Sequence, residues 1–584
     1  MKKILIITTD VIKIKQLTGV IGKTYSAVYL FLFKLILKIT IWFYRRSFQV
    51  SVLALDCSKI KQVNVFYYSH ELTHLNLAEN RRQYLKATDK ILKEIQQKQE
   101  SFFQESGINI TQLFKTRLAH FLADRYLVDS QVCRQVISQI KPDKIIYLNL
   151  FGLNRINDKL FKFLLTREYR KKLNMFICQS QVPLPALAVY HQASLLSLDF
   201  YRHLKSFKPI YQKLAAEKYN PLIITDITNP DAKLHNIDLP ANYLFLASFL
   251  PEARQLAKIY NYQLKKILVS FHHPSRPLIF YSLILSKLYL KAGEKLFKEL
   301  DPKNVIVVSD LRFLETGLAA LAKKSRTFSL MISPNTLLDS TQINPYDTTD
   351  KITLPGDFVK NQLIKIGLPE KKLTVVGDLQ LESKPKFTKR QVYKTLGVDN
   401  LDKKIVLLIS FRPNSMIPTE EKKLFVQWCS AAVRQVKAVI LVIKPHPTEK
   451  RSTLVKELES YGVKNVVVAD NQKLELADLL SASAVVLQTW SMTLFEAVAM
   501  NRPVISVNPL SKDYNFFLPV INTGGAVEVT TQAALVKYLQ IFQDHHNPRT
   551  QNQLNRANRA VKHFINSGNV RASDKVFALL RKKT

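Results

Sequence analysis

Short apolar runs separated by stretches with helical spacing recur along most of the chain. Runs of four to seven apolar residues, each followed by a helix-length stretch, are typical of buried strands in a parallel sheet with crossover helices. We therefore expect one parallel sheet from the five runs in the last third of the chain. These runs are Lys404–Ser410, Val439–Ile443, Val466–Ala469, Ala484–Gln488 and Pro503–Val507.

The earlier part of the chain repeats this alternation and adds longer helical segments, including the stretch 76–139. A charged segment at 384–404 separates the earlier runs from the later ones, and 584 residues exceed what one hydrophobic core needs. We predict an α/β fold with two facing Rossmann-like domains, residues 1–385 with helical insertions and residues 386–584. The earlier runs are Ile4–Thr8, Gln49–Leu55, Gln62–Tyr68, Asp143–Leu148, Met175–Gln179, Pro221–Thr225, Lys266–Phe271, Asn304–Ser309, Thr327–Ile332, Lys351–Leu354 and Leu373–Val376.

A basic and apolar segment lies near the N-terminus. Ser26–Tyr44 is nearly long enough to span a bilayer, but Lys34 and Lys38 lie at its middle. Each central Lys costs roughly 2.5–3.5 kcal/mol, which a dozen apolar residues barely offset. Lys34, Lys38 and Arg45 fall on one stripe of a helix. We favour a helix over residues 23–46 lying on an anionic membrane surface, with a spanning helix and a buried crossover helix as alternatives.

The charge balance points to anionic partners. Lys and Arg outnumber Asp and Glu by 85 to 46, and the formal net charge is +39. A membrane surface, phosphorylated substrates and nucleic acid are compatible with this excess, although a Lys-rich composition also contributes to it. Because the sequence has no recognisable nucleic-acid-binding motif, no nucleic-acid partner is expected.

Cysteine usage and the N-terminus indicate a compartment. The four Cys are far apart with no His at ligand spacing, so neither a metal site nor a disulfide framework is predicted. Such scattered thiols suit a reducing compartment. The N-terminal apolar run is too short for the core of a signal peptide. We expect a cytoplasmic protein, peripheral at the inner face of the cell membrane.

Two loops after predicted strands carry candidate anion-binding residues. The run that ends at Ser410 is followed by Arg412, which can contact phosphate through two parallel hydrogen bonds. The next run ends in Lys444-Pro445-His446-Pro447, where two prolines hold His446 in extended backbone at the edge of the sheet. His446 can donate a hydrogen bond to a nucleotide phosphate and Lys444 can add charge. A solvated loop Arg and a rigid surface turn are the alternatives.

A third loop opens a helix with several hydroxyl groups. Thr489, Ser491 and Thr493 follow the fourth run, and Glu496 comes three residues later on the face of Thr489 and Thr493. Hydroxyl groups beside free helix amides favour an anion, whereas Glu496 suits ribose hydroxyls. The alternative is that Ser491 or Thr493 only caps the helix.

The order of these motifs resembles the C-terminal domain of GT-B glycosyltransferases. The motifs are Lys444–Pro447, the Thr-x-Ser-x-Thr-x-x-Glu-Ala run over 489–497, and Arg502–Val507; Lys351–Asp378 is similar to the part before that domain. The likeness covers roughly 304–530. It is strongest to the bacterial cell-envelope group that includes capsule-polysaccharide and CDP-glycerol transferases, and weaker to sugar-nucleotide 2-epimerases.

The resemblance implies a GT-B-like fold with the donor's diphosphate in a cleft against the C-terminal domain. It implicates His446, Ser491, Thr493 and Glu496, with Arg412 beside them. It implies no metal and no separate cofactor, because the nucleotide-activated donor is itself a substrate.

The chain departs from the family pattern on the other side of the cleft. Ser333-Pro334-Asn335 stands where relatives carry Gln-His-Gly, and Asn501-Arg502 stands where a Gly is usual. The catalytic base is therefore not assigned by resemblance. Asp10 and Asp310, each directly after a predicted strand, are candidates, and ordinary strand-end caps are the alternative.

We therefore predict a glycosyltransferase that moves a sugar from a nucleotide-activated donor to a glycan or lipid-linked acceptor in cell-envelope synthesis. The alternatives are a CDP-glycerol-type glycerophosphotransferase, a sugar-nucleotide 2-epimerase and a non-catalytic membrane-associated GT-B scaffold.

Overall fold

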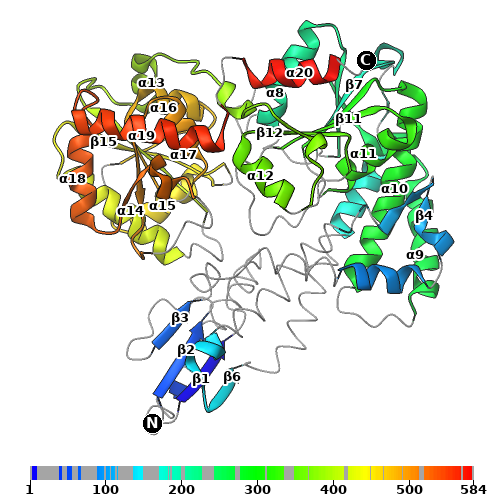
Figure 1. The fold of residues 1–584 in the computed structure, drawn as a ribbon, viewed down its shortest axis with the longest axis horizontal. Helices are drawn as coiled ribbons and strands as arrows, with labels where there is room; N and C mark the ends of the chain where they lie inside the picture. Colours follow the sequence, from blue (N-terminus) through cyan, green and yellow to red (C-terminus); the bar gives the residue numbers. More distant parts are fainter. Residues whose placement is uncertain are drawn as a thin grey trace.

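The computed structural model of the chain contains two α/β units and a smaller N-terminal sheet in the part that it describes (Figure 1). The described residues are 3–8, 39–41, 49–54, 64–67, 88–97, 100–105, 107–111, 113, 115, 136–148, 170–181, 183–184, 187–198, 204–226, 242–269, 276–308, 312–333, 348–365, 367–412, 419–447, 449–463, 466–489, 491–511, 519–566 and 570–581.

The first α/β unit, on the right in Figure 1, is built on a seven-stranded parallel sheet. Its strands are β7 (Ser194–Leu198), β8 (Pro221–Thr225), β9 (Tyr243–Phe245), β10 (Asn304–Val307), β11 (Phe328–Ile332), β12 (Lys351–Leu354) and β13 (Leu373–Val375). The chain runs outward from β7 to β9, returns to β10 beside β7, and continues to β13. This order is that of a doubly wound sheet.

Helices cover this sheet and include an insertion between β9 and β10. The helices are α8 (Leu204–Ala216), α9 (Ala253–Ile267), α10 (Arg276–Leu300), α11 (Phe313–Ser325) and α12 (Asp357–Lys365). Side chains of β7, β8 and β10 form one buried cluster with α9, α10 and α11. Helices α9 and α10 both lie between β9 and β10, whereas the helical stretch named from the sequence was 76–139, within which residues 88–96 are helical.

The second α/β unit carries the sheet predicted from the last third of the chain. Its strands are β14 (Lys404–Ile409), β15 (Val439–Lys444), β16 (Val467–Val468), β17 (Ser483–Gln488), β18 (Val504–Val507) and β19 (Val527–Val529). They pair in parallel in the order β16-β15-β14-β17-β18-β19. The predicted five-stranded parallel sheet is confirmed, and β19 extends it.

Both faces of this sheet are covered by helices. Ile405, Leu407 and Ile409 of β14 belong to one buried cluster, and Val406 and Leu408 belong to the other. This alternation is the two-residue period of a strand buried on both sides. The helices are α13 (Lys389–Leu396), α14 (Thr419–Arg434), α15 (Arg451–Ser460), α16 (Leu476–Ala482), α17 (Thr493–Ala499), α18 (Gln532–Phe542) and α19 (Pro548–Phe564).

The first four predicted strands form a sheet of their own. They are β1 (Lys3–Thr8), β2 (Gln49–Ala54), β3 (Asn64–Tyr67) and β6 (Lys144–Leu148), paired in parallel in the order β3-β2-β1-β6. The strands were predicted correctly. The prediction that they share one N-terminal sheet with the later runs was wrong. Apolar spacing does not encode which strands pair.

Two predicted strands are wrong. Residues 170–179, which include Met175–Gln179, are helical, and Lys266 and Ile267 end α9. In α9 the buried positions follow the helical spacing of three and four residues, at Ala253, Ala257, Tyr260 and Leu264. A short apolar run at the end of such a helix cannot be distinguished from a buried strand by its length alone.

The predicted membrane helix lies largely outside the described residues. Of residues 23–46 only 39–41 are described, and they are helical. Among the helices that the structure describes, none is long and apolar enough to cross a bilayer.

The last helix packs with the first α/β unit, not with the sheet that precedes it. Helix α20 (Ala572–Arg581) lies beside α8 (Figure 1) and buries Val576, Phe577 and Leu580 in one cluster with residues of β7 and β10. The sequence placed all of 386–584 together, because the apolar spacing of α20 does not reveal its partner. The boundary at 385 stays a prediction.

The two units also meet through their backbones. The amide of Asn566, two residues after α19, donates to the Pro355 carbonyl, 2.8 Å away. A Cβ on Gly356 would lie 1.9 Å from the carbonyl oxygen of Phe564. Only glycine permits this approach. The α/β class with two facing Rossmann-like units is thus confirmed.

Candidate nucleotide-binding site

The loops chosen from the sequence lie at one edge of the second unit's sheet. Its chain order reverses between β14 and β17, and in open α/β sheets ligands bind at the carboxyl ends of strands beside such a reversal. The register pairs Ile409 with Lys444 and Leu408 with Leu487. The segments that begin at Ser410, Lys444 and Gln488 therefore leave the sheet side by side, about 4.8 Å apart.

The loop after β15 is held in place by hydrogen bonds to its own and neighbouring residues. Lys444 Nζ donates to Asn471 Oδ1 at 3.0 Å, and Asn471 Nδ2 donates to the Pro445 carbonyl at 3.2 Å. The His446 amide donates to Glu449 Oε2 at 2.7 Å, and the Glu449 amide donates back to the His446 carbonyl at 2.8 Å. His446 is half-buried. The loop thus presents His446 on a fixed backbone.

The buried side chain of Lys422 forms an ion pair with Glu449. Lys422 on α14 is 1% exposed, and its Nζ lies 2.6 Å from Glu449 Oε1 and 2.7 Å from Glu457 Oε2. Glu457 also accepts from the Tyr461 hydroxyl at 2.5 Å. The buried charge of Lys422 is thus neutralised by two carboxylates, and each carboxylate accepts a further hydrogen bond, from the His446 amide or the Tyr461 hydroxyl. Lys422 therefore connects the core of the unit to the His446 loop.

The turn after β17 brings its hydroxyl groups together. Ser491 Oγ donates to Thr493 Oγ1 at 3.0 Å and accepts from the Thr493 amide at 3.2 Å. The Gln488 side chain accepts from the Ser491 amide. Thr489 is only 2% exposed, and its carbonyl accepts from Ser506 Oγ at 2.7 Å. Ser491 therefore bonds to the first residue of α17 from the position before the N-cap, which is Met492, while Thr489 lies beneath the surface.

A cleft of about 810 Å³ lies between the two α/β units. Of the residues chosen from the sequence, Lys444 and Glu496 line it, and Glu496 is half-buried. An apolar wall from the second unit lies beside them, formed by Leu474, Leu476, Ala477, Leu480 and Met500. Apolar walls with a few polar groups are usual for sites that hold organic ligands.

The acidic groups in the cleft already have partners within the protein. Six basic and four acidic side chains line it. Three of the acids are bonded within the protein: Glu382 accepts from the Ser573 amide and hydroxyl, Glu475 pairs with Lys386 at 2.9 Å, and Asp574 pairs with Lys213 at 3.1 Å.

Three cations in the cleft have no such partner. The side chains of Lys208 of α8, Lys384 after β13 and Arg571 before α20 make no ion pair or hydrogen bond with any residue that the structure describes. Together with Lys444, they make basic side chains outnumber acidic ones in the cleft. Such a cleft attracts anions.

The remaining predicted residues are placed as follows. Arg412 is exposed directly after β14, at the reversal point of the sheet. Asp10 and Asp310 lie outside the described residues, as do Pro334 and Asn335. Ser333 is 7% exposed, and its amide donates to the Thr353 carbonyl at 3.0 Å. The roles of Arg412, Asp10 and Asp310 stay predictions.

One departure from the family pattern has a simple backbone explanation. Asn501 has a φ of +54°, the left-handed conformation that favours Gly and that Asn adopts more readily than other residues. Arg502 donates to the Ser481 carbonyl at 2.8 Å, and burial lowers the pKa of its guanidinium. Asn501 therefore adopts a left-handed turn at the position where the sequence resemblance leads us to expect Gly.

Sequence reasoning missed the residues that support the site. Asn471 follows β16, which corresponds to the shortest of the five runs predicted in the second unit, and its bonds to Lys444 and Pro445 depend on strand pairing. Glu449 comes three residues after His446, a spacing that could have suggested the reciprocal bond to the His446 amide. Nothing in the local pattern around Lys422 indicates that it is buried.

No protein-family model matches the chain, and no curated protein matches it. Its fold is similar to the UDP-GlcNAc 2-epimerase from Methanocaldococcus jannaschii, with 15% identity, a TM-score of 0.44, and 67% of this chain and 99% of that one covered. A glycosyltransferase from Rickettsia africae matches at 12% identity and a TM-score of 0.41, covering 68% and 99%. The wall teichoic acid polymerase TagF matches at 12% and 0.43, covering 74% and 98%.

Proposed function

We propose that the protein is a GT-B-type glycosyltransferase that transfers a sugar from a nucleotide-activated donor to a glycan or lipid-linked acceptor of the cell envelope. The observation that carries the proposal is the cleft between the two units, where Lys444 and Glu496 lie with cations that no described carboxylate neutralises. A nucleotide diphosphate offers the matching charge. The motif order over 444–507 supports the same assignment.

In this proposal the second unit binds the leaving group. The His446 imidazole donates to the diphosphate, and Lys444 adds charge beside it. Glu496 accepts hydrogen bonds from the ribose hydroxyls, and Ser491 and Thr493 border the phosphates. The acceptor hydroxyl displaces the diphosphate directly, and donors aimed at the developing negative charge lower the barrier. The acceptor side and the catalytic base stay unassigned.

A ligand screen by thermal shift tests the donor class. We expect one family among UDP-, GDP-, CDP- and CMP-sugars and CDP-glycerol to raise the melting temperature. A ligand at 100 times its Kd adds about 2.7 kcal/mol of stability. The Glu496→Gln variant tests whether the shift arises at the cleft and should lose most of it, and the His191→Ala variant, at an exposed residue of the first α/β unit, is the control and should keep the shift. No shift with any of these compounds would contradict the proposal.

The same screen separates the alternatives. A response to CDP-glycerol alone would favour glycerophosphate transfer. Interconversion of a UDP-sugar with its 2-epimer, without an acceptor, would identify an epimerase. Donor binding without turnover in the presence of membrane extracts would favour a non-catalytic scaffold.

We further propose that the protein is peripheral at the cytoplasmic face of the membrane through residues 23–46. The support is the stripe of Lys34, Lys38 and Arg45 along an apolar helix.

The Lys34→Glu/Lys38→Glu variant tests this helix. Each Lys near an anionic surface contributes about 1 kcal/mol, so we expect binding to fall on the order of 25-fold or more. Cosedimentation with anionic liposomes at low and high salt measures it. Lys394→Glu/Lys456→Glu, two exposed lysines of the second α/β unit, is the control. Equal binding by both variants would mean that the helix is buried or spans the bilayer.

A further inference from the structure

The exposed face of α9 combines cations with large apolar side chains. Arg254, Lys258, Tyr262, Lys265 and Val269 follow one another at intervals of four, four, three and four residues, so they lie on one side of the helix and its C-terminal turn. All five are exposed, Tyr262 by 61% and Val269 by 64%. We call these five residues the α9 outer face.

Further residues of the same kind flank this face. Ile259 is 43% exposed, and Lys266 lies with its Nζ 4.6 Å from the centre of the Tyr262 ring. No acidic residue occurs between 253 and 269. A helix side with four cations, three large apolar groups and no carboxylate is unusual for a surface that meets only water.

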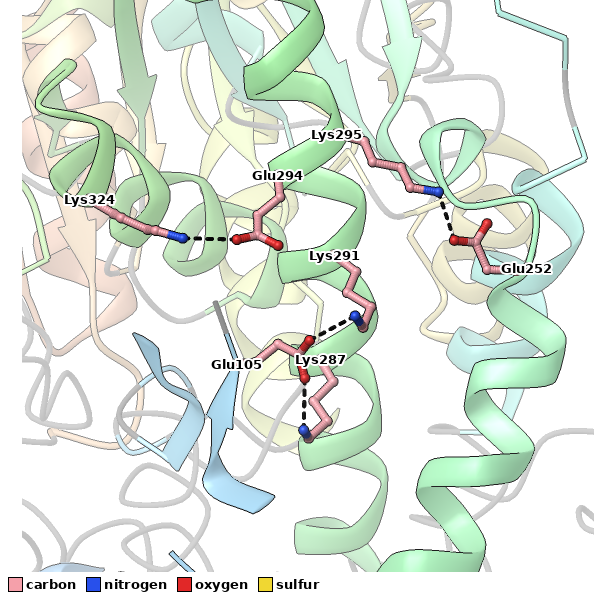
Figure 2. A network of polar contacts seen from close by, with 7 residues as sticks. All are labelled: Glu105, Glu252, Lys287, Lys291, Glu294, Lys295 and Lys324. Carbon is pink, nitrogen blue, oxygen red and sulfur yellow. Dashed lines mark hydrogen bonds and ion pairs between the residues drawn. The ribbon is translucent and has the colours of Figure 1, made fainter. Parts of the chain in front are cut away.

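On the neighbouring helix α10, by contrast with α9, charged side chains form ion pairs within the protein. Figure 2 shows its lysines paired with carboxylates: Lys287 and Lys291 with Glu105 at 2.8 and 3.0 Å, and Lys295 with Glu252 at 2.7 Å. Its Glu294 pairs with Lys324 at 3.0 Å. By contrast, the four cations of α9 form no ion pair with any described residue. The unpaired charge therefore lies on α9.

Contacts with α10 fix the orientation of α9. Tyr260 is buried on the inner side of α9, and Lys287 Nζ lies 5.0 Å from the centre of its ring. The Glu252–Lys295 ion pair joins the start of α9 to α10 (Figure 2). The outer face is thus presented on a helix that is anchored at its start and along its inner side.

We propose that the α9 outer face binds an anionic lipid bilayer. The cations match anionic headgroups, and Tyr262, Ile259 and Val269 match the boundary between headgroups and acyl chains, where Tyr is enriched. Nucleic acid fits less well, because a phosphate backbone would contact the cations but not the exposed apolar side chains of Ile259 and Val269. This surface lies in the first α/β unit and is distinct from residues 23–46. The inference does not rest on the donor or on the chemistry of the cleft.

A charge variant tests the electrostatic part of the proposal. Lys258→Gln/Lys265→Gln should weaken binding to vesicles of phosphatidylcholine with 30% phosphatidylglycerol on the order of 25-fold, since each Lys contributes about fivefold near such a surface. Binding to pure phosphatidylcholine should be weak for every variant. The control, Lys394→Gln/Lys456→Gln, removes the same charge from the second α/β unit and should bind as the unchanged chain does.

An apolar variant distinguishes a bilayer from a polyanion. Tyr262→Ser/Val269→Ser keeps every charge, so it should lower vesicle binding while leaving the affinity for a fluorescein-labelled 20-nucleotide RNA unchanged. All substituted side chains are exposed, so the melting temperatures should stay within a few degrees of the unchanged protein, which circular dichroism can check.

The outcomes decide the proposal in either direction. Loss of vesicle binding in both α9 variants, with the control unaffected, supports it. Full vesicle binding by both α9 variants overturns it, whatever the Lys34→Glu/Lys38→Glu variant does. Loss of RNA binding in the charge variant without loss of vesicle binding also overturns it, in favour of a nucleic-acid surface. Donor binding by thermal shift should be the same in all these variants.

Discussion

Replacement of His446 by alanine is expected to lower kcat about a hundredfold or more with little change in nucleotide affinity. The proposed bond from the imidazole strengthens as charge develops on the departing diphosphate, and loss of one such donor costs about 2.7–4 kcal/mol in the barrier. The loop itself should survive, because its hydrogen bonds use the His446 backbone and the Glu449 and Asn471 side chains.

Glu496→Gln, at a residue that lines the cleft, provides the contrast to His446→Ala. A ribose contact is nearly the same before and during the reaction, so its loss should weaken nucleotide binding more than it lowers kcat. Isothermal titration with the nucleotide found by the screen, run beside initial rates, separates the two effects. Exposed His191 in the first α/β unit is the matched control, and His191→Ala should change neither quantity. Unchanged rate and affinity in both the His446→Ala and Glu496→Gln variants would remove the catalytic assignment of this site.

The Lys422→Met variant is expected to lose about 3–5 kcal/mol of unfolding free energy. Loss of the Lys422 cation leaves the half-buried carboxylates of Glu449 and Glu457 close together without it, and one broken partner costs that much in buried ion pairs. The His446 loop should loosen as well, since Glu449 holds its backbone. Urea unfolding measured by tryptophan fluorescence is suitable, because Trp428 lies on the same helix, α14.

Two further variants sharpen this test. Lys423→Met changes the next residue, which is half-buried with its Nζ 5.9 Å from the Tyr461 ring centre, and should cost less than about 1 kcal/mol. The triple variant Lys422→Met/Glu449→Gln/Glu457→Gln should regain part of the lost stability, because it removes the unpaired charges. Equal stability of Lys422→Met and Lys423→Met would show that the three charged groups do not depend on one another.

The strands of the second α/β unit could be predicted because each is a short apolar run bounded by polar loops. Val439–Lys444 and Lys404–Ile409 are central strands buried on both faces, and their sequences show this directly. The same pattern led to wrong strand predictions within 170–179 and at the end of α9, where a short apolar run belongs to a helix. Which distant strands pair, as in the separate N-terminal sheet, cannot be predicted from the local spacing of apolar residues.

The site was predictable only where one loop carries its own constraint. Two prolines mark the His446 loop in the sequence, and the structure places it at the expected sheet edge. Asn471, Lys422 and the cations Lys208, Lys384 and Arg571 come from distant segments, so their convergence depends on tertiary packing. Thr489 could not be recognised as buried, because a hydroxyl after a strand is equally common in a cap.

The packing of α20 on α8 sets an order for folding during protein synthesis. The cluster that contains Leu196, Leu204 and Ile306 is completed by Val576 and Phe577, and these two residues are translated after every strand of the sheet at 404–529. Domains generally fold as units as the ribosome delivers them. The unit at 404–564 is therefore complete before the unit at 194–375, whose strands emerge earlier but which keeps an open apolar surface until α20 emerges. During that interval the nascent chain offers chaperones a site that the finished protein no longer has.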